Sequence, residues 1–147
     1  TGIFIIFFAM MLTRSRDTHY THKKAGFFYS GVGIAYVGSV LFPCDPGCPL
    51  FSTDPVQIIH NSLAIVEYGG GMIALYFWGL WYNALKQDNL AQYAHLSIIV
   101  VFLAFVAMVL PDLRFIRGIS QRIGELTLFV WMVIIAISLA KFNRGRG

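Results

Sequence analysis

The chain has 147 residues, of which 57% are hydrophobic and only 12% are charged, and its mean hydropathy is +0.68. A soluble domain of this length needs more polar surface than these residues supply, so the composition excludes a soluble globular protein. The net charge of +4 would suggest a nucleic-acid partner for a soluble chain. Here, however, the basic residues lie in short connections between apolar runs, as in membrane proteins, so we expect no nucleic acid to bind.

Five apolar runs predict helices at about residues 2–13, 25–43, 56–84, 92–110 and 119–141. A helix needs about 20 residues to cross roughly 30 Å of hydrocarbon, so the first run is short for a full span. Because the chain starts with Thr1 rather than Met, we expect residues to be missing before it, and a sixth helix in the full protein. The predicted fold class is all-α: one polytopic transmembrane helix bundle over residues 1–147.

The basic residues of the connections predict the orientation of this bundle. If the runs alternate in direction, only three arginines fall on one side of the membrane, and the other side receives Arg14, Arg16, Lys23, Lys24, Lys86, Lys141, Arg144 and Arg146. The more basic side of a membrane protein is normally the cytoplasmic side. We therefore expect an integral protein of a bacterial inner membrane, with residues 43–49 outside.

The loop at residues 43–49 contains both cysteines of the chain and no Lys or Arg. Thiols oxidise outside the cytoplasm, and Asp45-Pro46-Gly47-Cys48 has Pro and Gly at the two central positions of a type II turn. The sequence therefore predicts a disulfide between Cys44 and Cys48, with two free thiols in a tight turn as the alternative. A cysteine pair alone offers too few ligands for zinc, and we predict no metal site.

The third run begins with Asp54-Pro55, which are typical N-cap and first-turn residues of a helix. His60 and Glu67 lie seven residues apart, on the same helix face but roughly 10 Å apart in depth, so they cannot share a proton directly. A carboxyl deep in a membrane is costly if it is ionised and unpaired. Glu67 is either a group of a proton relay, a quinone site or a polar-ligand site, or a protonated acid bonded to a neighbouring helix.

Two further features of this run concern packing. The triplet at residues 69–71 is Gly-Gly-Gly, which permits the close approach of a helix or of a ligand, and we favour a helix. Trp78, Trp81 and Tyr82 are predicted to anchor the helix at the cytoplasmic interface. His19 and His22, in the basic connection before the second run, have a spacing that would allow two metal ligands on one helix face, but we favour a position facing solvent or lipid headgroups.

The outer connection before the last run departs from the usual charge pattern because it contains Arg114, Arg117 and Arg122. Guanidinium groups bind phosphate in a bidentate manner, so these arginines could hold an anionic lipid headgroup. They could instead form ion pairs with nearby acids, which we favour; the available partners are Asp45, Asp54, Asp112 and Glu125. Gln121 and Glu125 are predicted, with Glu67, to be buried polar residues.

Three short motifs together resemble a known family. They are Leu41-Phe42-Pro43-Cys44-Asp45-Pro46-Gly47, then His60, then Gly118-Ile119-Ser120-Gln121-Arg122 leading into a helix with Trp131. The chain resembles the DUF998 family of uncharacterised multi-helix membrane proteins. The resemblance implies six helices and a polar cluster at the outer face made of Asp45, His60, Asp112, Gln121 and Arg122.

No complete catalytic motif is present, and we predict no cofactor. The leading hypothesis is a non-catalytic accessory or structural subunit whose partners are membrane lipids and other membrane protein subunits. The alternative is an enzyme or transporter for a lipid or other amphiphile at the outer leaflet, with His60, Asp45 and Asp112 as acid–base or metal-binding groups and Arg122 for an anionic headgroup. A third hypothesis makes Glu67 a protonation switch.

Overall fold

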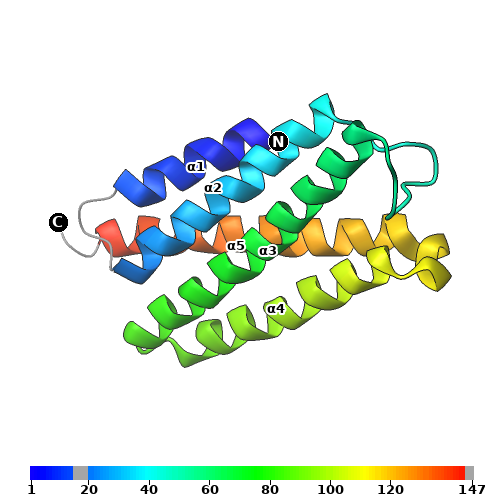
Figure 1. Ribbon diagram of the computed structural model, residues 1–147. Helices are drawn as coiled ribbons and strands as arrows, with labels where there is room; N and C mark the ends of the chain where they lie inside the picture. The colour runs from blue at the N-terminus through cyan, green and yellow to red at the C-terminus, as the bar shows by residue number, and fades with distance from the viewer. Residues whose placement is uncertain (15–19, 145–147) are drawn as a thin grey trace. The chain divides into compact units, whose positions relative to one another are not determined.

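The computed structural model describes the chain except for residues 15–19 and 145–147 and the side chains of Arg114 and residues 142–144. Arg16, His19 and Arg146 therefore lie outside the described residues. Those described are 87% helical, contain no strand, and form five α-helices and one 3-10 helix (Figure 1). In chain order these are α1 Gly2–Arg14, α2 Tyr20–Leu41, α3 Pro55–Ala84, α4 Asp88–Val109, η1 Pro111–Ile116 and α5 Arg117–Arg144. The predicted all-α class and its five helices are confirmed.

Three of the described helices, α3, α4 and α5, are long and apolar enough to cross a membrane. The helix α1 is apolar but has only 13 residues. The helix α2 has 22 residues but falls outside this group, because Lys23, Lys24 and several glycines and serines lower its hydropathy. The span at residues 25–43 therefore remains a prediction.

Two helices begin four or five residues before their predicted starts. The helix α2 begins at Tyr20 rather than at residue 25, and α4 begins at Asp88 rather than at residue 92. The predictions followed the apolar runs, whereas helices continue into polar residues that favour helix, such as lysine, or that suit a first turn, such as aspartate. For α2 the difference places His22 inside a helix.

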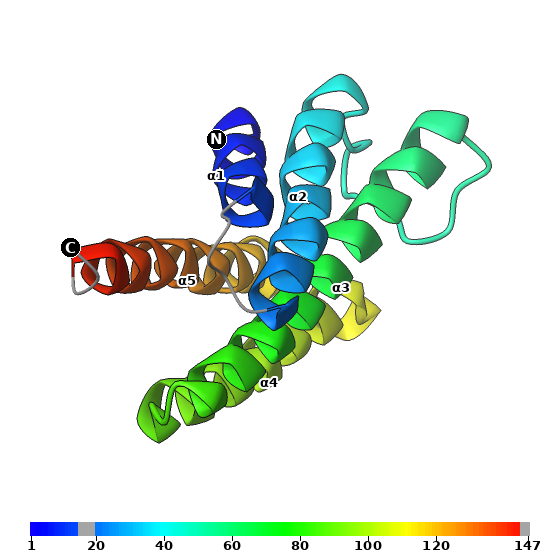
Figure 2. The same ribbon diagram turned by 90° about the vertical axis from the view of Figure 1, so that its left-hand side faces the viewer.

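The chain divides into two compact units, Thr1–Ile98 and Ile99–Gly147, with the boundary inside the continuous helix α4. In the first unit, α1 runs beside α2, and α2 runs beside α3 (Figures 1 and 2). The second unit contains the rest of α4, η1 and α5. The single domain over residues 1–147 remains a prediction.

Glycines allow the helices of the first unit to approach closely. A Cβ added to Gly33 of α2 would lie 2.9 Å from the backbone nitrogen of Ile6 in α1, and one added to Gly70 of α3 would lie 3.1 Å from the backbone oxygen of Phe28 in α2. Neither position has room for a side chain without movement of a neighbouring helix. Helix packing is thus the role of Gly70, whereas a Cβ at Gly69 would meet nothing within 4 Å.

Aromatic residues fill the space between the start of α2 and the end of α3. Trp78 and Tyr82 are fully buried and Trp81 is nearly so. The ring of Trp78 lies 5.0 Å from that of Tyr29, and the ring of Trp81 lies 4.5 Å from that of His22, between centroids. The predicted solvated position of His22 is therefore wrong, because the earlier start of α2 provides a helical surface against which these rings pack. The anchoring of α3 at the cytoplasmic interface by Trp78, Trp81 and Tyr82 remains a prediction.

Candidate functional site

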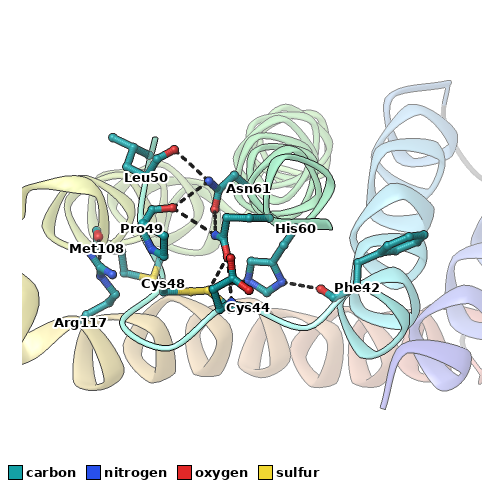
Figure 3. Close-up of a disulfide and its surroundings, with 11 residues drawn as sticks. Phe42, Cys44, Cys48, Pro49, Leu50, His60, Asn61, Met108 and Arg117 are labelled. Atoms are coloured by element: carbon teal, nitrogen blue, oxygen red, sulfur yellow. Dashed lines mark hydrogen bonds between the residues drawn. A yellow bond between two sulfur atoms is a disulfide. The ribbon is translucent and has the colours of Figure 1, made fainter. Parts of the chain in front are cut away.

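The loop between α2 and α3 is closed by a disulfide between Cys44 and Cys48, as predicted (Figure 3). Their Cα atoms lie 5.4 Å apart, within the normal range for bridged cysteines. The backbone nitrogen of Cys48 donates a hydrogen bond of 2.8 Å to the carbonyl of Asp45, and Gly47 has φ +83°. This is the geometry of the predicted type II turn, in which the third residue needs a positive φ.

The first turns of α3 position the side chains that face this loop. Asp54 is the N-cap of the helix, as predicted, and its carboxylate accepts a hydrogen bond from the backbone nitrogen of Val56, while Pro55 occupies the first turn. A proline there removes no hydrogen bond that the helix needs. Starting the helix at this point turns Gln57, His60 and Asn61 toward the loop.

Gln57 joins α3 to both sides of the disulfide. Its side chain is fully buried. Its Oε1 accepts a hydrogen bond of 2.8 Å from the backbone nitrogen of Asp45, and its Nε2 donates to the carbonyl of Pro49 at 3.1 Å and to Oδ1 of Asn61 at 2.9 Å. Both the donor and the acceptor groups of this amide are therefore used to hold the loop.

Asn61 continues the same network one turn later in α3. Its Nδ2 donates to the carbonyls of Pro49 at 3.2 Å and of Leu50 at 2.9 Å (Figure 3). Together with Gln57 it holds the backbone on the C-terminal side of Cys48. The loop is thus fixed by a covalent bond and by side-chain hydrogen bonds to the helix that follows it.

His60 lies between the end of α2 and the disulfide (Figure 3). Its Nδ1 lies 2.8 Å from the carbonyl oxygen of Phe42, and its Nε2 lies 3.9 Å from Sγ of Cys48. A carbonyl oxygen can only accept, so Nδ1 carries the hydrogen, and in the neutral ring the lone pair of Nε2 points toward the sulfur. The ligand atoms of Cys44, Cys48 and His60 all lie within 4.8 Å of one another.

The remaining predicted residues of the outer face belong to the second unit. Asp112 and Arg114 lie in η1, and Arg117 donates from Nε to the carbonyl of Met108 at 2.9 Å. Gln121 donates from Nε2 to Oε1 of Glu125 at 2.7 Å. Within each unit the structure brings Cys44, Cys48 and His60 together, and Gln121 and Glu125 together; one cluster of Asp45, His60, Asp112, Gln121 and Arg122 remains a prediction.

The polar residues predicted to be buried differ in exposure. Glu67 is only 6% exposed, close to the middle of α3, whereas Glu125 is half-buried and Gln121 is exposed. Arg122 is also exposed, and the described residues form no ion pair with it. Glu125, one of the acids named as possible partners of the arginines, instead accepts a hydrogen bond from Gln121.

Sequence reasoning missed Gln57 and Asn61, which hold the loop. Their signal was present, because residues three and seven positions after the N-cap Asp54 lie on the same helix face as His60. Amides near the start of a helix are common, however, and only the path of the loop shows which carbonyls they bind.

A family model described as "Protein of unknown function (DUF998)" matches residues 1–138 of the 147 residues. No curated protein and no solved structure matches the chain.

Proposed function

The chain belongs to the DUF998 family, and we propose that it is a non-catalytic accessory subunit of a larger membrane complex, which presents the loop between α2 and α3 to a partner protein. Its apolar helices are those of an integral membrane protein. We place it in a bacterial inner membrane with this loop outside, since disulfides persist in oxidising compartments and the opposite connections are the more basic ones.

The observation that carries this proposal is the exposure of Phe51 on a rigid loop. Phe51 directly follows the backbone held by Asn61 and is 91% exposed, and the neighbouring Leu50 is 39% exposed. Aromatic side chains are frequent anchors of protein interfaces, and a surface that is already fixed loses little conformational entropy when it binds. Exposed apolar side chains on the helices are explained by lipid contact alone, whereas Phe51 lies in the connection before α3, three residues after Cys48, next to backbone that Asn61 holds in place.

The network around Gln57 supports this role because it fixes the loop without providing a reaction centre. Its amide is saturated by the loop backbone and by Asn61. The ring of His60 faces a carbonyl on one side and the disulfide on the other. The amides of Gln57 and Asn61 are arranged to hold the shape of the loop, and a partner that binds this shape is the function they fit best.

Photo-crosslinking in native membranes tests the proposal. We expect benzoylphenylalanine in place of Phe51 to give an adduct of defined protein mass, and a Gln57→Ala change in the same chain to reduce its yield. Phe4 of α1, which is 76% exposed, is the matched control and should give lipid adducts only. Lipid adducts alone at both positions would refute the proposed partner contact.

An enzyme or transporter that acts on a lipid at the outer leaflet remains the rival function. It needs the imidazole of His60 for chemistry, together with Asp45 or Asp112 and with Arg122. We expect His60→Ala to leave lipid turnover and lipid binding in membranes unchanged. Loss of either property in a folded His60→Ala protein would favour the rival.

A further inference from the structure

The sulfur atoms of Cys44 and Cys48 and the free ring nitrogen of His60 meet on one side of the loop (Figure 3). We propose that, when the disulfide is reduced, these three residues bind one soft, thiophilic cation of the Cu(I) type, and that the disulfide is the closed state of this site. The proposal goes beyond the accessory role and does not depend on it.

The orientation of His60 is that of a metal ligand. Ligating histidines usually donate their second ring hydrogen to a carbonyl or carboxylate, which fixes the tautomer and the direction of the ring. Here Nδ1 is held by the Phe42 carbonyl at 2.8 Å, so Nε2 is the nitrogen left for a ligand. That nitrogen lies 3.9 Å from Sγ of Cys48.

The distances suit an ion with three ligands. With metal–sulfur and metal–nitrogen bonds of about 2.3 and 2.0 Å, a trigonal site places sulfur and nitrogen roughly 3.7 Å apart. The observed separation of Cys48 Sγ and His60 Nε2 is 3.9 Å. The two sulfurs must move to roughly 4 Å from each other, which rotation of their side chains permits with the Cα atoms 5.4 Å apart.

The ligand set selects the kind of ion. Thiolates are soft ligands and favour Cu(I), whereas structural zinc sites need four protein ligands. Within the described part of the chain, the cluster consists of Cys44, Cys48 and His60, with no fourth His, Cys, Asp or Glu. Three ligands of this type complete a trigonal Cu(I) site, whereas zinc would need a fourth ligand such as water.

Opening the site is a two-electron reduction. A dithiol donor supplies two electrons and two protons to the sulfur–sulfur bond and is itself oxidised to a disulfide, which leaves Cys44 and Cys48 as thiols. The cation then displaces the two thiol protons, and His60 contributes the lone pair of its neutral ring. No oxidation or reduction of the cation is required.

The loop hydrogen bonds keep the two thiols near each other after reduction. Gln57 holds the backbone at Asp45 and at Pro49, which are the residues next to the two cysteines. Its Oε1 also lies 3.4 Å from Sγ of Cys44, where it can accept from the thiol. The ligands are therefore preorganised, and the binding free energy is not consumed in gathering them.

Metal titration of the purified full chain tests the proposal. The protein, oxidised or reduced with a phosphine that is then removed, is titrated without oxygen with Cu(I) delivered as its bicinchoninate complex, and in parallel with Zn(II). We expect one Cu(I) per reduced chain, none per oxidised chain, and an X-ray absorption spectrum with two sulfur ligands and one nitrogen ligand. His60→Ala should weaken Cu(I) binding at least ~10-fold, whereas His95→Ala, which changes a histidine outside the loop, should not.

Equal Cu(I) binding by the oxidised and reduced wild-type chains, or no binding by either, would overturn the proposal. So would a spectrum without the nitrogen ligand, full affinity in His60→Ala, or stronger retention of Zn(II) than of Cu(I). The comparison of the two wild-type forms needs no substitution, so a folding defect in a variant cannot decide the outcome.

Discussion

Replacing Gln57 by alanine should loosen the disulfide loop more than any other single change in α3. The change removes three hydrogen bonds, to Asp45, Pro49 and Asn61, from a side chain that is fully buried. At about 1 kcal/mol for each bond, the free energy of opening the loop falls by about 3 kcal/mol, which is roughly a 150-fold increase in the open population. The disulfide keeps the ends of the turn together, so the change is local.

Hydrogen exchange of the chain in lipid nanodiscs measures this effect directly. The backbone amide of Asp45, which donates to Gln57, should exchange roughly 100-fold faster in Gln57→Ala. Gln92→Ala is the matched control, because Gln92 is an exposed glutamine of α4. An exchange rate at Asp45 within about threefold of wild type would show that the side-chain bonds of Gln57 do not hold the loop.

Three further changes test other parts of the account. Gly70→Ala should destabilise the chain by about 1 kcal/mol or more, because the added Cβ meets the α2 backbone. Gly69→Ala is the control and should not destabilise it, because a Cβ there meets nothing within 4 Å. Equal thermal unfolding midpoints of the two variants in detergent would contradict this packing. Asp54→Ala should lose about 1 kcal/mol with the N-cap of α3, seen as a lower unfolding midpoint, and an unchanged midpoint would argue against the cap. His22 lies ahead of the predicted span, and burial lowers its pKa from 6.5 to about 4. The stability of the chain should therefore be full above pH 6.5 and should fall by up to about 3 kcal/mol as the pH decreases toward 4, because the buried ring resists protonation. His22→Phe should abolish this pH dependence, and a variant that keeps it would point to another group.

The all-α fold and the approximate helix positions follow from composition and from the length of the apolar runs. The N-cap at Asp54 and the type II turn at Asp45 were also predictable, because each depends on a few adjacent residues with strong local preferences. Helix starts were less accurate, as in α2, because the end of an apolar run marks the membrane boundary rather than the end of the backbone hydrogen bonds.

The candidate site was only partly predictable. The disulfide was predictable from the spacing of the cysteines and from the compartment expected for the loop. The approach of His60 to Cys48, in contrast, depends on how the chain returns from α2 to α3, across 12 residues. The contacts of Gln57 and Asn61 depend on the same path. Sequence patterns report helix faces well, whereas they do not report which loop carbonyl lies opposite a given side chain.

The sidedness of the two sulfurs tests the central claim, that this is a membrane-integrated protein with its disulfide loop outside the cell. After reduction by an impermeant phosphine, an impermeant maleimide should label Cys44 and Cys48 in intact cells. Gln87→Cys, exposed in the connection between α3 and α4 and made in a chain whose two native cysteines are serine, should be labelled only in inside-out vesicles. Labelling of the native cysteines solely in inside-out vesicles would contradict the account.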